Sequence, residues 1–128
     1  MNKQLDILLI EDNFLEIMKM KRTLSLLELN HTLSEAKDAE IALEILKGSK
    51  RYPDLILLDL NMPKISGIEF LDILKKSEDF RHIPTVILTT SDNKSDLEEC
   101  YKLGISGYIL KPLKYEDYVK KMDAVLTY

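Results

Sequence analysis

Short apolar runs and stretches of helical periodicity alternate along the 128-residue chain. The predicted strands are residues 5–10, 31–36, 54–59, 84–89 and 106–110. Their apolar centres are short, about four residues at most, which is typical of strands covered by helices on both faces. A stretch with apolar residues at helical spacing follows each strand. Strict alternation of this kind predicts an α/β fold, a doubly wound five-stranded parallel sheet built as (βα)5.

Boundary residues predict where several of these elements begin and end. Asn13 is expected to cap the helix after the first strand. Ser95 and Glu98 have the spacing of a capping box, which predicts that the fourth helix opens there, and Gly104 is expected to follow its last turn. The strand at 31–36 is more polar than the others, so it is predicted to lie at an edge of the sheet.

The third strand ends at a carboxylate. Asp59 follows the apolar run Leu55–Leu58, and Pro63 is expected to prevent the strand from continuing. In open parallel sheets the ligand crevice lies at the carboxyl ends of the strands. Asp59 is therefore predicted to lie where such sheets bind ligands.

Other polar residues follow the remaining inner strands and are expected at the same edge. They are Glu11 and Asp12 after the first strand, Thr89 at the end of the fourth and Lys111 after the fifth. Three neighbouring carboxylates repel one another unless a cation compensates them, and one lysine is not enough. A hard divalent ion such as Mg²⁺ fits this oxygen-rich set. Metal, lysine and hydroxyl could each take one phosphoryl oxygen while a carboxylate attacks phosphorus in line.

Composition and charge exclude several other classes. The hydrophobic fraction of 45% suits a globular domain, and the net charge of −4 does not favour general binding to nucleic acid. No apolar run approaches the length of a membrane span, and no secretory signal is visible, so a cytoplasmic protein is expected. A single cysteine, Cys100, excludes an intrachain disulfide. The four glycines form no nucleotide-binding loop, so any phosphoryl group should come from outside.

Four ordered motifs resemble the receiver domains of two-component response regulators, especially the single-domain, chemotaxis-regulator-like members. They are Ile7-Leu-Leu-Ile-Glu-Asp-Asn13, Leu57-Leu-Asp-Leu-Asn-Met-Pro63 with Gly67, Leu88-Thr-Thr90 and Gly107-Tyr-Ile-Leu-Lys-Pro112. The resemblance implies the flavodoxin-like strand order 2-1-3-4-5 and one receiver domain over residues 1–128, without an output domain. The chain also resembles receivers that partner phytochrome-type or hybrid histidine kinases.

The resemblance further implies a metal site and a phospho-acceptor. Asp59 would accept the phosphoryl group. Asp12 and Asp59 would ligate Mg²⁺ directly, Glu11 through water, and Asn61 through its backbone carbonyl. Glu11 stands where the family more often has Asp.

The same resemblance assigns the switch. Lys111 would contact the phosphoryl group and would be followed by a cis bond to Pro112. Thr89 would move its hydroxyl onto a phosphoryl oxygen, and Tyr108 matches the aromatic position that changes rotamer on activation. Thr90 stands where the family usually has Ala or Gly, so access to the site could be narrower.

These expectations combine into a stand-alone phosphorelay receiver that is not an enzyme. A histidine kinase or phosphotransfer protein would phosphorylate it, and binding to a downstream target would carry the signal. The sequence leaves open whether the protein also forms a homodimer. The alternative is a receiver-like adaptor that works without phosphorylation. An enzyme is less consistent with the residues: Glu11 and Asp12 would repel a flavin phosphate, and Asn61 stands where aspartyl-phosphate phosphatases carry a second Asp.

Overall fold

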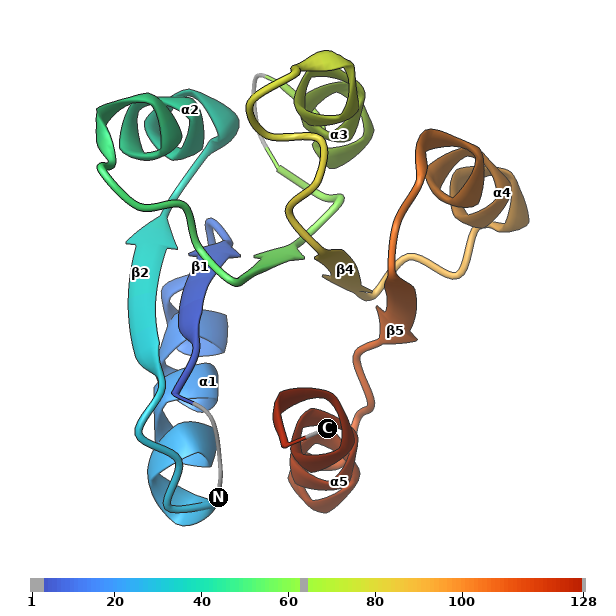
Figure 1. Ribbon diagram of the computed structural model, residues 1–128. Helices are drawn as coiled ribbons and strands as arrows, with labels where there is room; N and C mark the ends of the chain where they lie inside the picture. The colour runs from blue at the N-terminus through green and yellow to red at the C-terminus, as the bar shows by residue number, and fades with distance from the viewer. Residues whose placement is uncertain (1–3, 63–64, 128) are drawn as a thin grey trace.

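Five parallel strands form one sheet in the order β2-β1-β3-β4-β5, with helices on both sides (Figure 1). The computed structural model describes residues 4–62 and 65–127. The strands are β1 (Asp6–Ile10), β2 (Thr32–Ala36), β3 (Leu55–Leu58), β4 (Thr85–Thr89) and β5 (Gly107–Leu110). The helices are α1 (Phe14–Leu26), α2 (Ala39–Gly48), α3 (Gly67–Lys76), α4 (Lys94–Leu103) and α5 (Tyr115–Leu126). The predicted fold class and strand order are confirmed.

The strands divide their side chains between two cores. Leu8 and Ile10 of β1 point toward α2, α3 and α4, whereas Ile7 and Leu9 point toward α1 and α5. Figure 1 shows these two groups of helices on opposite faces of the sheet. Each fully buried aliphatic side chain contributes about 1.5–3 kcal/mol by leaving water. Because both faces of β1 and β3 are covered, β3 is apolar throughout and β1 is apolar from Ile7 onward, and the two strands hold the middle of the sheet in one register.

The edge strands and helix ends follow mostly from local sequence. β2, the polar strand, lies at one edge as predicted. Asn13 caps α1 by accepting a hydrogen bond from the backbone N–H of Leu15 at 2.9 Å. Gly104 ends α4 with φ 101°, a left-handed conformation that glycine adopts without strain. Both of these boundary predictions are confirmed.

The predicted start of α4 is wrong. The helix begins at Lys94, and its cap is Asn93, whose side-chain oxygen accepts hydrogen bonds from the N–H groups of Ser95 at 2.8 Å and Asp96 at 3.3 Å. One asparagine therefore satisfies two of the orphan donors of the first turn, which leaves no capping role for Ser95. The predicted strand stop at Pro63 lies outside the described residues.

No helix among residues 4–62 and 65–127 combines the length and apolar character needed to cross a membrane.

Gly67 lies so close to the backbone after β3 that it has no room for a side chain. A Cβ atom there would lie 2.5 Å from Leu60 Cα and 2.6 Å from the carbonyl oxygen of Asp59. We expect Gly67→Ala to lower the free energy of unfolding by about 1–3 kcal/mol, because backbone atoms must shift. Urea unfolding of both proteins measures this difference. Gly48→Ala is the matched control, since a Cβ atom at that position would have no neighbour within 4 Å; equal losses in both variants would contradict the packing argument.

Cys100 is buried in α4, and this burial raises the pKa of its thiol to about 11. The thiol therefore stays protonated at pH 8, where only thiolates react rapidly with disulfide reagents. We expect the native protein to react with such a reagent far more slowly than the urea-unfolded chain. Since the unfolded thiol loses its proton at lower pH than the native one, Cys100 also makes the native state less stable as pH rises above about 9. Equal native and unfolded labelling rates at pH 8 would show that Cys100 is accessible.

Candidate functional site

Backbone hydrogen bonds of the sheet place the candidate side chains at its carboxyl edge. The N–H groups of Glu11, Asp59 and Lys111 each donate to a carbonyl of the neighbouring strand, at 2.9, 3.1 and 2.8 Å. Each residue is thus the last one held by the parallel ladder before its loop begins. The strand order puts β1 next to β3 at the centre of the sheet, which is the position where doubly wound sheets change direction and bind ligands.

Three carboxylates lie together at this edge. Glu11, Asp12 and Asp59 each offer an oxygen, and these oxygens all lie within 4.8 Å of one another. Glu11 and Asp59 are buried, with 2% and 7% of their surfaces exposed, while Asp12 faces solvent. Oxygen donors in this number and spacing suit a hard cation such as Mg²⁺, with its remaining positions open to water or phosphate. The residues present therefore fit a divalent metal.

One ammonium group compensates part of this negative charge. Lys111 Nζ donates to Glu11 Oε1 at 2.5 Å and lies 3.9 Å from Asp59 Oδ2. Its side chain is only 6% exposed, so water screens these interactions weakly. Lys111 therefore links β5 to the acids that follow β1 and β3.

Burial dominates the ionisation of Glu11. Loss of water has the largest effect, Lys111 acts in the opposite direction, and neighbouring Asp59 adds to the effect of burial; together they raise the pKa of Glu11 to about 7. The ionised form of Glu11 is thus held at an energetic disadvantage that one lysine does not remove. A divalent cation at the three acids would supply the missing positive charge.

Thr89 and Asn61 connect the loops after β3 and β4. The buried Thr89 hydroxyl accepts hydrogen bonds from Asn61 Nδ2 at 3.4 Å and from the backbone N–H of Ser91 at 3.2 Å. Asn61 Nδ2 also lies 3.4 Å from the Thr90 hydroxyl, and the Asn61 N–H donates to Asp59 Oδ1 at 3.2 Å. Asn61 therefore contacts the carboxylate of Asp59 and the hydroxyls of both threonines. Through this contact the side chain of Thr90 forms part of the site.

Tyr108 does not contact the acids but reaches the same loop from β5. Its hydroxyl donates to the backbone carbonyl of Ser91 at 2.8 Å, and the ring is half-buried. Burial raises the pKa of this phenol. A continuous path of hydrogen bonds thus runs from Asn61 through Thr89 and Ser91 to Tyr108.

The expected cis bond before Pro112 is not found. Every peptide bond in the described part of the chain is trans, including the one that joins Lys111 to Pro112. The trans form of an X–Pro bond is favoured by about 0.5–1 kcal/mol in the absence of other forces. Lys111 Nζ reaches Glu11 with this trans bond.

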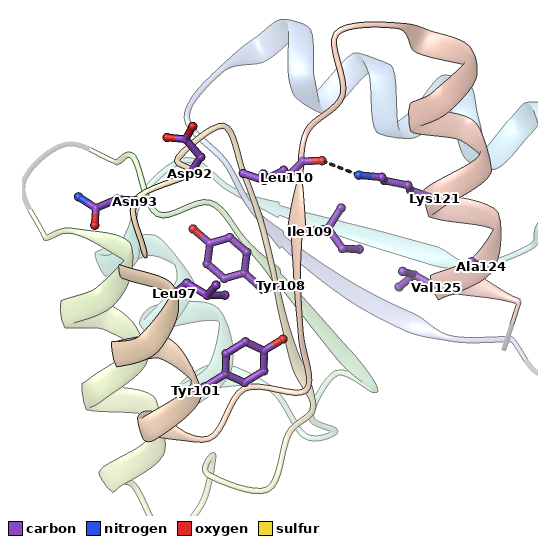
Figure 2. Close-up of a pocket in the computed structure, with 10 residues that line it drawn as sticks. All are labelled: Asp92, Asn93, Leu97, Tyr101, Tyr108, Ile109, Leu110, Lys121, Ala124 and Val125. Atoms are coloured by element: carbon purple, nitrogen blue, oxygen red, sulfur yellow. Dashed lines mark hydrogen bonds between the residues drawn. The ribbon is translucent and has the colours of Figure 1, made fainter. Parts of the chain in front are cut away.

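A groove of about 620 Å³ lies between α4, β5 and α5 (Figure 2). Leu97 and Tyr101 of α4 form one wall with Tyr108, while Val125 of α5 lies on the opposite side. Lys121 of α5 closes part of the groove by donating to the Leu110 carbonyl at 3.3 Å. Tyr108 therefore lines the groove and is also the last residue of the hydrogen-bonded path that begins at Asn61.

Glu16 is a site residue that no motif in the sequence marks. Its Oε2 atom lies 3.8 Å from Lys111 Nζ. An acid in the first turn of a helix that starts at the carboxyl edge is the only local signal for it, and such acids usually serve the helix dipole.

The family model described as the response regulator receiver domain matches residues 7–123. A curated relative, the "Probable methanogenesis regulatory protein FilR2" of Methanothrix harundinacea, is 36% identical over 126 residues, which is 95% of this chain and 81% of that protein.

Two solved structures show the same fold in proteins of similar length. The phosphorylated cyanobacterial phytochrome response regulator RcpA has a TM-score of 0.87 and 31% identity, covering 97% of this chain and 94% of that one. The Mn²⁺-bound form of response regulator Rcp1 has a TM-score of 0.86 and 31% identity, covering 96% and 94%. That structure of Rcp1 holds a divalent cation, Mn²⁺.

We expect Mg²⁺ to stabilise this protein against heat. A ligand present at 100 times its dissociation constant adds about 2.7 kcal/mol to the free energy of unfolding. Asp12→Asn should require at least about tenfold more Mg²⁺ for the same rise in melting temperature, because it loses a charged ligand. Differential scanning calorimetry against Mg²⁺ concentration measures this.

Asp79→Asn is the control for the Mg²⁺ experiment, since Asp79 is exposed in the turn after α3, at the opposite end of the sheet. Mg²⁺ should stabilise it as it does the unmodified protein. A response of Asp12→Asn that matches this control would place the cation elsewhere.

Proposed function

The chain belongs to the family of response regulator receiver domains, and we propose that it is a phosphorylation-dependent switch whose phospho-acceptor is Asp59. The observation that carries this proposal is the placement of the Asp59 carboxylate beside the other two acids and Lys111, with an Oδ2–Nζ distance of 3.9 Å. Receiver domains act in signalling and not as typical enzymes. Here the acceptor is a residue of the protein itself.

The transfer uses side chains that already face the acceptor. An Asp59 oxygen attacks phosphorus, a P–O bond forms, and the donor's bond to phosphorus breaks with its electron pair leaving on the donor. Mg²⁺ would be held by Glu11, Asp12 and Asp59 and by the backbone carbonyl of Asn61. It would supply positive charge for the phosphoryl oxygens. Lys111 and the hydroxyl of Thr89 provide further hydrogen-bond donors in a poorly solvated crevice.

Phosphorylation then changes what Thr89 can bind. It adds about −1.5 to −2 charge and three acceptor oxygens beside Thr89, whose present hydrogen-bond partners are neutral. Thr89, at present an acceptor for Asn61 and Ser91, gains a stronger partner if its O–H turns toward the phosphoryl group. Moving Thr89 disturbs the loop whose Ser91 carbonyl holds Tyr108.

The groove beside Tyr108 is the proposed surface for a downstream target. Tyr101 and Leu110 leave 53% and 40% of their surfaces exposed, so the groove offers apolar area to a partner. A shift of the Tyr108 ring would change the shape of its wall. Partner binding and phosphorylation are coupled in this scheme because both depend on the Ser91 loop.

The donor in this proposal is a histidine kinase or a phosphotransfer protein. Similarity to the phytochrome response regulator RcpA supports a phytochrome-type kinase as one candidate. We propose a cytoplasmic receiver that signals through protein partners.

Incubation with Mg²⁺ and acetyl phosphate should add one phosphoryl group to the protein, seen by intact-mass spectrometry. Asp59→Asn should abolish the addition, because an amide oxygen is a much weaker nucleophile than a carboxylate. Asp92→Asn is the control, since Asp92 is an exposed acid in the loop after β4. A folded, Mg²⁺-binding protein that keeps its unmodified mass would refute the proposal, as would a persisting mass increase in Asp59→Asn.

A further inference from the structure

Lys111 has a second anion within reach that lies outside the group of three acids. Its Nζ atom is 2.5 Å from Glu11 Oε1 and 3.8 Å from Glu16 Oε2. Glu11 belongs to the candidate metal site, whereas Glu16 lies in the first turn of α1. The same Nζ atom lies 3.9 Å from Asp59 Oδ2. The ammonium therefore has two partners that a cation would share, Glu11 and Asp59, and one that a cation would leave alone.

Glu16 is poised to interact more strongly with Lys111. Its Oε2 atom is inaccessible to solvent and makes no well-directed hydrogen bond within the described part of the chain. The nearest positive groups are Lys19 Nζ at 3.2 Å and Lys111 Nζ at 3.8 Å. An oxygen shielded from water that lacks a good donor gains from any ammonium that approaches it.

Lys19 keeps Glu16 in place from the other side. Its Nζ donates to Glu16 Oε1 at 3.3 Å and lies 4.6 Å from the centroid of the Tyr118 ring. Tyr118 is 1% exposed in the core under α5, so it is a fixed support for the lysine. Glu16 is consequently oriented by α1 and α5 together instead of swinging freely on the helix surface.

We propose that Glu16 is a positioning residue that receives the Lys111 ammonium when Glu11 turns to a bound divalent cation. The inference rests on the proposed function, since it concerns the same site. At 2.5 Å, Lys111 competes with a cation for the charge of Glu11. When Glu11 and Asp59 both give their charge to the cation, Glu16 keeps Lys111 from being left as an uncompensated buried charge, which would be costly. Glu16 thereby favours cation binding and keeps Lys111 at the edge for the phosphoryl group.

A double-mutant cycle on cation affinity tests this role. We expect Glu16→Gln to weaken Mg²⁺ binding by about fivefold, measured by titration calorimetry. In a Lys111→Met background, the same Glu16→Gln change should alter the dissociation constant by less than about 1.5-fold, because residues that act through one another are not additive. Equal weakening in both backgrounds would overturn the proposal and reduce Glu16 to a general negative charge. No weakening in the unmodified background would also overturn it.

Glu35→Gln is the matched control for the loss of one negative charge. Glu35 forms its ion pair with Lys21 and is 34% exposed, so its loss should leave Mg²⁺ affinity nearly unchanged. Weakening by Glu35→Gln equal to that by Glu16→Gln would count against a specific role for Glu16.

A second measurement does not need the Lys111→Met protein to fold. In the Mg²⁺-bound protein the Lys111 ammonium should give an observable NMR signal, because its side chain is 6% exposed and held by Glu16. Glu16→Gln should broaden this signal through faster exchange with water, and Glu35→Gln should not. An unchanged signal in Glu16→Gln would overturn the proposal. Neither experiment uses a phosphoryl donor, so a failure of Asp59 to accept phosphate would be recognised separately.

Discussion

The burial of Glu11 and Asp59 side by side is the interaction on which the rest of the structure depends. Two carboxylates in a poorly solvated crevice repel each other, and each has lost part of its hydration. Lys111 offsets part of this cost through its contacts with both acids, and Glu16 and Lys19 extend the alternation of charges to α1. The remaining negative charge at this edge suits a divalent cation. The charges of the site are therefore balanced only when a ligand completes it.

An unbalanced arrangement of charges requires a rigid support. The apolar strands β1 and β3 provide it, since their side chains are buried on both faces and their ladder hydrogen bonds continue into Glu11 and Asp59. Gly67 lets the loop after β3 fold back so that α3 begins directly behind the acceptor. Without that close approach, the carbonyl of Asp59 and the first turn of α3 could not occupy their present positions. Packing of the backbone and the apolar strands directly behind the charges thus fixes the distances between them.

The proposed switch requires a physical link between this rigid edge and the groove beside Tyr108. The loop after β4 is the connection, because Thr89 lies at the acids and Ser91 holds Tyr108 at the groove. Both contacts are single hydrogen bonds, worth about 0.5–1.5 kcal/mol each, so the charge that the proposed phosphorylation would add at Asp59 would be strong enough to rearrange them. The core strands on either side are too well packed to yield. In the proposed switch the rearrangement would therefore be confined to this loop and the ring of Tyr108.

Local sequence determined much of this protein. Four apolar residues followed by Asp59 identify a buried strand and its carboxylate, Asn13 and Gly104 mark helix ends, and the acids and lysine after successive strands predict a shared edge because parallel strands end on one side. Local pattern gave the wrong cap where two residues compete for one role, since Asn93 caps α4 in place of Ser95. The family resemblance suggested a cis bond before Pro112, and the structure has a trans bond there. Only the tertiary structure decided that Glu16 reaches Lys111, that Asn61 binds both threonines and that Tyr108 reaches Ser91. These contacts join residues on different elements, and their formation depends on how helices and loops pack against the sheet, which spacing along the chain does not encode.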